Sequence, residues 1–260
     1  MKVLFIGDIV GRIGRDILKQ KLPEIKLQEQ PDLILANAEN LAHGNGISEK
    51  TIKEMVDIGI EFFTSGNHVW DNKQGVEYMQ RKDAVVIRPA NYPKSNPGVG
   101  YKIIEAGTRK VLIINLLGQV FMKECLSSPF TTADEILKEC NQETPIIIVD
   151  IHAEATSEKQ ALWHYLDGRV SAVIGTHTHV ATANPRISQK GTALVEDIGF
   201  VGGLDSVIGA DKNIILTRFL TQISVPFNPV ETGPTAINSV LLDIDANTGK
   251  TMFIKRIDIY

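Results

Sequence analysis

Residues 2–8 read Lys-Val-Leu-Phe-Ile-Gly-Asp, a β-branched and aromatic run that ends in a glycine and an acid. Such a run favours a buried strand that stops where the glycine permits a turn. Apolar residues then recur at helical spacing from Ile17 to Ile25, which predicts a helix over 14–27. The start of the chain is therefore expected to fold as strand, loop and helix.

The same alternation returns along the chain. Strands are expected at 33–35, 62–64, 85–87, 145–149 and 171–174, and helices at 48–58, 74–82 and 157–167. Ser157 is a candidate cap for the last of these helices. Strands that alternate with helices form crossover units around a largely parallel sheet.

Two regions favour antiparallel hairpins instead. Residues 101–104 and 111–114 flank a Gly107-Thr108 turn, and 239–243 and 251–259 flank a turn at 245–249. A second sheet, or an edge of the first, is expected from them. The pattern predicts an α/β fold of two packed mixed sheets flanked by helices, an α/β/β/α sandwich that forms a single domain over residues 1–260.

The composition is that of an ordinary globular protein, with 43% hydrophobic and 22% charged residues. A net charge of -4 argues against a broad footprint for long nucleic acid, which clustered Lys and Arg would neutralise. Apolar runs are too short for a secretion signal or a membrane span, so we expect a cytoplasmic protein without a membrane partner. Cys125 and Cys140 lack metal-ligand spacing and are expected to be buried and inert.

Polar side chains follow directly after many of the expected strands. They are Asp8, Asn37, Glu39, Asn40, Asn67, His68, Asp150, His152, His177 and His179. The carboxyl ends of strands in open α/β sheets share one rim, so these residues are expected to converge. Oxygen and imidazole ligands without a thiolate suit Mn, Fe or Zn, and the set is large enough for two ions. Two ions about 3.5–4 Å apart, bridged by a carboxylate such as Glu39, suit phosphoester hydrolysis.

The order of Gly7-Asp8, Asn37–Asn40, Gly66–His68, His152 and Gly175–His179 resembles the calcineurin-like metallophosphoesterase superfamily. Longer stretches, NAENLAHGNGI, GNHVWD, DIHAEATSEK, GTHTHV and DSVIG, resemble the YmdB-like bacterial phosphodiesterases over nearly the whole chain. The superfamily usually opens with Asp-x-His, whereas Ile9-Val10 follows Asp8 here, and that departure is itself the pattern of the YmdB-like branch.

The resemblance implies a role for each of these residues. One ion would be held by Asp8, Glu39, Asn40 and His179, and a second by Glu39, Asn67, His152 and His177. His68 would donate a proton to the leaving alkoxide while a metal-bound hydroxide attacks in line from the opposite side. The resemblance also implies iron or manganese, with zinc as an option, 2′,3′-cyclic and 3′,5′-cyclic nucleotides as substrates, and a homo-oligomer. On a regular strand His177 and His179 would face the same side. If they bind different ions, the backbone that carries them must be irregular.

Several alternatives stay open at the level of sequence. A phosphomonoesterase or an RNA-end nuclease would use the same ions, and a metal-containing nucleotide-binding regulatory protein is the alternative outside the enzymes. The glycines after the first strand do not favour a dinucleotide-binding fold. The glycine motif of that fold places its first two glycines two positions apart, whereas Gly7 and Gly11 are four positions apart. His43 and the 202–209 segment have no assigned role, and Asp150 and Glu154 are candidates to orient His152.

Overall fold

Strand β1 (Lys2–Ile9) lies at the centre of the fold and is buried on both faces in the computed structural model, which describes residues 1–140, 143–226 and 228–260. Alternate side chains of a strand point to opposite faces. Leu4 and Ile6 accordingly pack under the helices, whereas Val3 and Phe5 pack between the two sheets. One short run of sequence thus contributes to two separate cores.

In the described residues, β1 belongs to a six-stranded sheet, sheet A, in which the order is β12-β11-β10-β1-β2-β3. Its other strands are β2 (Leu33–Asn37), β3 (Phe62–Thr64), β10 (Phe200–Gly203), β11 (Thr235–Ile244) and β12 (Thr251–Ile259). Strands β1, β2, β3 and β10 run parallel, and β11 and β12 form the expected antiparallel hairpin.

Sheet B, also six-stranded over the described ranges, has the order β4-β5-β6-β7-β9-β8. Its strands are β4 (Tyr101–Ala106), β5 (Arg109–Leu117), β6 (Ile147–His152), β7 (Ala172–Thr176), β8 (Arg186–Ile187) and β9 (Ala193–Val195). Strands β4 and β5 form the hairpin expected around Gly107, and β5, β6, β7 and β9 run parallel. Both sheets are therefore mixed, as the sequence predicts.

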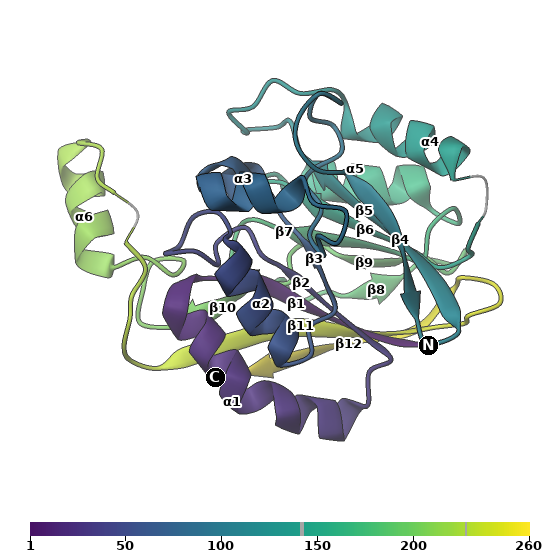
Figure 1. Cartoon of the computed structure of the whole chain (residues 1–260), viewed down its shortest axis with the longest axis horizontal. Coiled ribbons are helices and arrows are strands. Elements are labelled where there is room, and N and C mark those ends of the chain that lie inside the picture. Colours follow the sequence, from purple (N-terminus) through teal and green to yellow (C-terminus); the bar gives the residue numbers. More distant parts are fainter. Residues whose placement is uncertain (141–142, 227) are drawn as a thin grey trace.

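The sheets lie face to face and helices cover their outer sides (Figure 1). Helices α1 (Gly11–Glu29) and α2 (Glu49–Asp57) pack on sheet A, and α4 (Pro129–Glu139) and α5 (Thr156–Leu166) pack on sheet B. The 3₁₀ helix η1 (Asn67–Trp70) and α3 (Lys73–Met79) follow β3, and α6 (Lys212–Thr221) projects from the body (Figure 1). The expected α/β/β/α sandwich is confirmed.

Some local expectations were wrong. Val86 forms only an isolated bridge to Phe63, because β3 is three residues long and Pro89 soon ends the pairing. Helix α5 begins one residue before Ser157, so Ala155 is its N-cap and no side chain caps it. Cys140 is buried as expected, but Cys125 is exposed. Across the described ranges, each helix is too short or too polar to cross a bilayer.

Candidate metal centre

Asp8 lies near the end of β1, where the backbone at Gly7 packs directly against the backbone at Gly199. A Cβ on Gly7 would stand 2.1 Å from the carbonyl oxygen of Gly199, so the glycine is required for this contact. The Asp8 backbone N–H donates to that same oxygen at 3.1 Å. The Asp8 side chain is fully buried, and its Oδ1 has no hydrogen-bond partner among the described residues. A buried carboxylate oxygen without a donor is costly unless a cation is close.

The turn after β2 aims two further side chains at the same place. The Glu39 backbone N–H donates to Asn37 Oδ1 at 3.0 Å, which fixes the start of the turn. Asn40 donates its side-chain amide to the Gly44 carbonyl at 2.7 Å, which turns its Oδ1 toward His179 Nε2 at 3.3 Å. Asn40 thus stabilises its loop with the nitrogen and leaves the oxygen available as a ligand.

Helix η1 closes one side of the site. A Cβ on Gly66 would stand 2.3 Å from both Glu39 Oε2 and His152 Nε2, so the backbone here touches the candidate ligands directly. The next residue, Asn67, has a buried Oδ1 without a hydrogen-bond partner in the described parts of the chain. The His68 backbone N–H donates to Glu39 Oε2 at 3.2 Å. Asn67 and Asp8 therefore both carry orphaned oxygens of the kind that a metal ion satisfies.

His152 is oriented by a relay of hydrogen bonds. The Thr176 hydroxyl donates to Asp150 Oδ1 at 2.7 Å, so its oxygen accepts from His152 Nδ1 at 2.9 Å. Thr64 and Asn37 also donate to Asp150. The relay leaves His152 Nε2 directed at Glu39 Oε2, 3.1 Å away. Asp150 thus orients His152 through Thr176 rather than by direct contact.

His177 and His179 follow β7 in backbone that is irregular, as expected, with φ values of 100° and 61°. Positive φ turns the two imidazoles away from the alternation of a strand. His177 Nε2 lies 3.3 Å from Glu154 Oε2, and His179 Nδ1 donates to the Ile208 carbonyl at 2.8 Å. Of the two candidates to orient His152, Glu154 does not take that role, because it contacts His177 instead.

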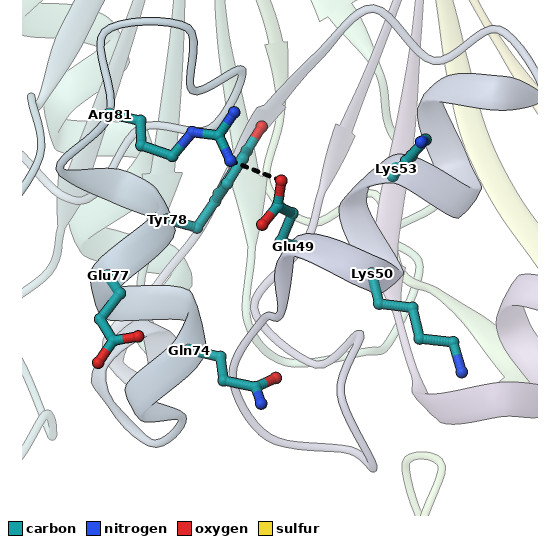
Figure 2. A pocket seen from close by; sticks show the side chains of 7 residues that line it. All are labelled: Glu49, Lys50, Lys53, Gln74, Glu77, Tyr78 and Arg81. Carbon is teal, nitrogen blue, oxygen red and sulfur yellow. Dashed lines mark hydrogen bonds and ion pairs between the residues drawn. The ribbon is translucent and has the colours of Figure 1, made fainter.

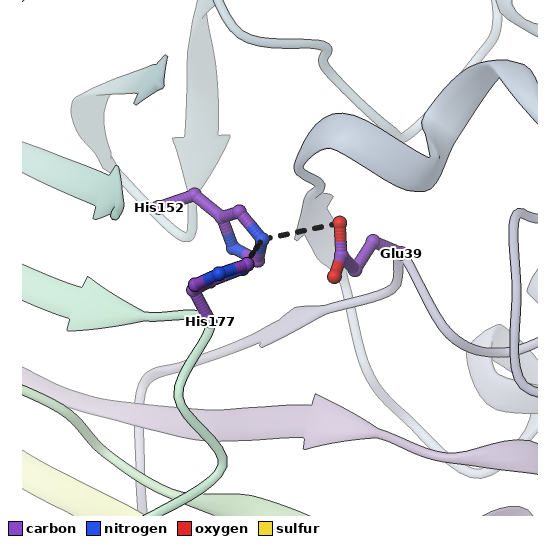
Figure 3. A group of neighbouring side chains, drawn as sticks. All are labelled: Glu39, His152 and His177. Atoms are coloured by element: carbon purple, nitrogen blue, oxygen red, sulfur yellow. Dashed lines mark hydrogen bonds and ion pairs between the residues drawn. The ribbon is translucent and has the colours of Figure 1, made fainter. Parts of the chain in front are cut away.

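The ligand atoms form two groups that share Glu39. Glu39, His152 and His177 offer atoms within 4.8 Å of one another (Figure 3). Asp8, Glu39 and His179 do so as well. His152 Nε2 faces both Glu39 Oε2 and His177 Nδ1 at 3.1 Å. His152 Nδ1 and His177 Nε2 already face oxygen atoms, so Glu39 Oε2, His152 Nε2 and His177 Nδ1 meet around one positive charge, which is either a proton on His152 or a bound cation. The residues present therefore fit two metal ions with a bridging carboxylate.

The electrostatics of the site favour positive charge. Burial raises the pKa of Asp8 well above its usual range, and the Glu39 charge adds to the effect. Burial alone would raise the pKa of Glu39 as well, but His152 lowers it to about 2. Burial works against the proton on His152, yet Glu39 and Asp8 raise the pKa of that imidazole to about 9. A metal ion would replace this proton.

The other two imidazoles lose charge instead. Burial, with repulsion from His152, lowers the pKa of His177 to about 3, and burial also lowers the pKa of His179. Both rings are therefore neutral near pH 7, which is the state that binds a metal. The site thus combines ionised Glu39 and two neutral imidazoles with His152, whose proton a metal ion would replace.

His68 is placed differently from the candidate ligands. Its side chain is 36% exposed and its Nδ1 lies 2.8 Å from Asp71 Oδ2, at the open side of the site. His43 is exposed in the loop after β2, and His164 is exposed on α5. Part of the 202–209 segment lies in β10, and its Ile208 holds His179. No motif pointed to Thr176 or Ile208 as orienting groups, because their roles depend on contacts between distant segments.

A groove elsewhere on the surface does not take part in this site. It lies between α2 and α3, has a volume of about 620 Å³, and is crossed by an ion pair between Glu49 and Arg81 (Figure 2). Lys50 and Lys53 extend from α2 into solvent beside it (Figure 2). Its lining residues include none of the candidate ligands.

The two packed sheets and the buried carboxylates and imidazoles at their rim define a metallophosphatase-like α/β protein. A novel phosphatase of Mycoplasma pneumoniae superposes with a TM-score of 0.92 and 35% identity, covering 100% of this chain and 93% of that one. A hypothetical protein of Thermus thermophilus superposes with a TM-score of 0.93 and 37% identity, covering 100% and 99% of the two chains.

The chain belongs to the YmdB-like family, whose model, described as YmdB-like protein, matches residues 4–257. A relative from Bacillus subtilis (strain 168), named 2′,3′-cyclic-nucleotide 2′-phosphodiesterase, is 44% identical over 257 residues. That match covers 99% of this chain and 96% of the relative. The family resemblance read from the motifs is thus confirmed.

Gly66→Ala is expected to empty the site, because the new Cβ would displace Glu39 and His152. The purified variant should contain fewer than two metal ions per chain by inductively coupled plasma mass spectrometry. Gly107→Ala is the matched control, since its Cβ would meet nothing within 4 Å although its φ of 60° costs about 1–2 kcal/mol of stability. Equal metal content in the two variants would contradict the close contact at Gly66.

Proposed function

We propose that this chain is a dinuclear metal-dependent phosphodiesterase that hydrolyses small cyclic nucleotides, with 2′,3′-cyclic nucleotides as the main class and 3′,5′-cyclic nucleotides as a second. The observation that carries the proposal is the convergence of two possible ligand groups on Glu39, together with the orphaned buried oxygens of Asp8 and Asn67. The activity named for the Bacillus subtilis relative supports the choice of substrate.

Asp8, Glu39, Asn40 and His179 would hold one ion, and Glu39, Asn67, His152 and His177 the other. Bound there, iron or manganese would supply Lewis-acid activation of water and balance the charge of the phosphate. The protein contributes rigid placement, because Thr176, Glu154 and Ile208 each occupy the ring nitrogen that faces away from the site. Since sheet A and sheet B both provide ligands, we propose that residues 1–260 act as one domain.

His68 is the proposed proton donor to the leaving alkoxide. Its Nδ1 is paired with Asp71, so its Nε2 is the atom available to the substrate. A ribose oxygen is a poor leaving group as an anion, and an imidazole titrates close to neutral pH. The 36% exposure of the side chain leaves it accessible, whereas His152 is fully buried.

Removal of metal tests the proposed function directly. The parent, reloaded with Mn²⁺ or Fe²⁺, is expected to hydrolyse bis-p-nitrophenyl phosphate and 2′,3′-cyclic AMP, and a chelator should abolish turnover until metal is restored. Asn67→Ala should lose metal and turnover because it removes an orphaned buried oxygen, while Asn213→Ala, exposed on α6, should behave as the parent. An inert reloaded parent that still binds nucleotide in chelator would favour a regulatory binding protein. Turnover of monoesters or RNA ends alone would favour the other hydrolases.

Replacement of His68 separates proton donation from metal binding. His68→Ala should keep both ions and lose turnover by about 10²–10⁴-fold, the usual contribution of a general acid. The loss should be smaller for bis-p-nitrophenyl phosphate, whose leaving group needs no proton. His164→Ala, which alters an exposed histidine on α5, is the control. Unchanged kcat for 2′,3′-cyclic AMP in His68→Ala would rule out the role.

A further inference from the structure

Lys159, in the first turn of α5, is fully buried and is not a candidate ligand. Lysine is rarely buried completely, and such a residue needs partners for its charge and its donors. Its Nζ donates to the Thr176 carbonyl at 2.9 Å and to Asp197 Oδ2 at 2.9 Å. The ammonium group therefore bonds directly to the backbone of the residue that precedes His177.

Asp197 is equally buried and holds the other side of the same turn. Its Oδ2 accepts from the Thr178 backbone N–H at 3.0 Å, and its Oδ1 accepts from the Gly199 N–H at 2.8 Å. Gly199 in turn accepts from the Asp8 N–H. One ion pair thus connects the turn that carries His177 and His179, after β7 of sheet B, with Asp8 at the end of β1 in sheet A.

The turn requires such support because its backbone is unfavourable. His177 and His179 both have positive φ, which costs free energy for residues other than glycine and persists only where the surroundings enforce it. Bonds to Thr176 and Thr178 bracket His177 on both sides. A regular continuation of β7 would direct both imidazoles to one side, where they could serve only one of the two ion positions.

We propose that the Lys159–Asp197 pair is a positioning device for the metal centre, which fixes the turn at 176–179 so that His177 and His179 serve different ions. The inference rests on the proposed function, because it takes the two histidines as ligands. Buried ion pairs often stabilise a fold no better than apolar residues of similar volume. The proposed positioning role therefore gives a reason for this pair other than the stability of the fold. Lys159 and Asp197 would act on the reaction only through the ligands that they place.

The test compares Lys159→Met, Lys159→Met/Asp197→Asn and Leu166→Ala. The single variant leaves a buried carboxylate unpaired and is expected to lower Tm. The double variant removes both charges, and its single amide oxygen can accept from only one of the Thr178 and Gly199 N–H groups, so it should recover part of the Tm. Leu166→Ala opens a cavity at the far end of α5, away from the turn, and serves as a control with lowered Tm alone.

Metal content and Mn²⁺ affinity by titration calorimetry are measured with Tm, kcat and KM. We expect the double variant to bind Mn²⁺ at least tenfold more weakly and to lose kcat despite its partly recovered Tm, while Leu166→Ala keeps two ions and the parent kcat. Two ions with parental Mn²⁺ affinity in the double variant would overturn the inference. A parent that binds two ions but hydrolyses no phosphodiester would overturn the proposed function instead, and the metal affinities would still decide the role of the pair.

Discussion

The mutual approach of Glu39, His152 and His177 is the interaction on which the rest of the site depends. Their facing atoms are stable together only around a positive charge, which a proton on His152 or a bound metal ion supplies. Glu39 comes from sheet A and the two histidines from sheet B, so the sheets must pack closely for the group to exist. The inter-sheet core that contains Phe5 and Ile148 therefore serves the site as well as the fold.

Orientation of each imidazole is controlled from outside the ligand cluster. Thr176 and Asp150 fix His152, Glu154 faces His177, and the Ile208 carbonyl fixes His179. Each contact directs one ring nitrogen at the site. His177 and His179 are neutral without the ion, whereas His152 carries a proton that a metal would replace. Glycine supplies the close approaches, with Gly7 beside Gly199 and Gly66 beside the ligands themselves. The close packing at these glycines and the hydrogen bonds to the imidazoles thus together fix the positions of the candidate ligands.

Sequence sufficed for the layers and for the gathering of polar residues at strand ends, because both are local signals. The assignment of particular residues to two ions came from the family resemblance and stays a prediction. The irregular backbone at His177 and His179 followed from strand periodicity combined with the two ion positions that the family resemblance implies. Contacts between distant segments were not accessible in this way: Glu154 faces a different histidine from the one expected, and Lys159 gave no signal of burial. Val86 fell short of a strand for a similar reason, since its pairing depends on the length of β3.

The central claim is a pair of metal ions bridged by Glu39, and anomalous X-ray diffraction from crystals of Mn²⁺-loaded protein tests it most directly. The account predicts two anomalous peaks about 3.5–4 Å apart, one beside Asp8 and His179 and the other beside His152 and His177, with Glu39 between them. A single peak, or peaks that avoid Glu39, would contradict it.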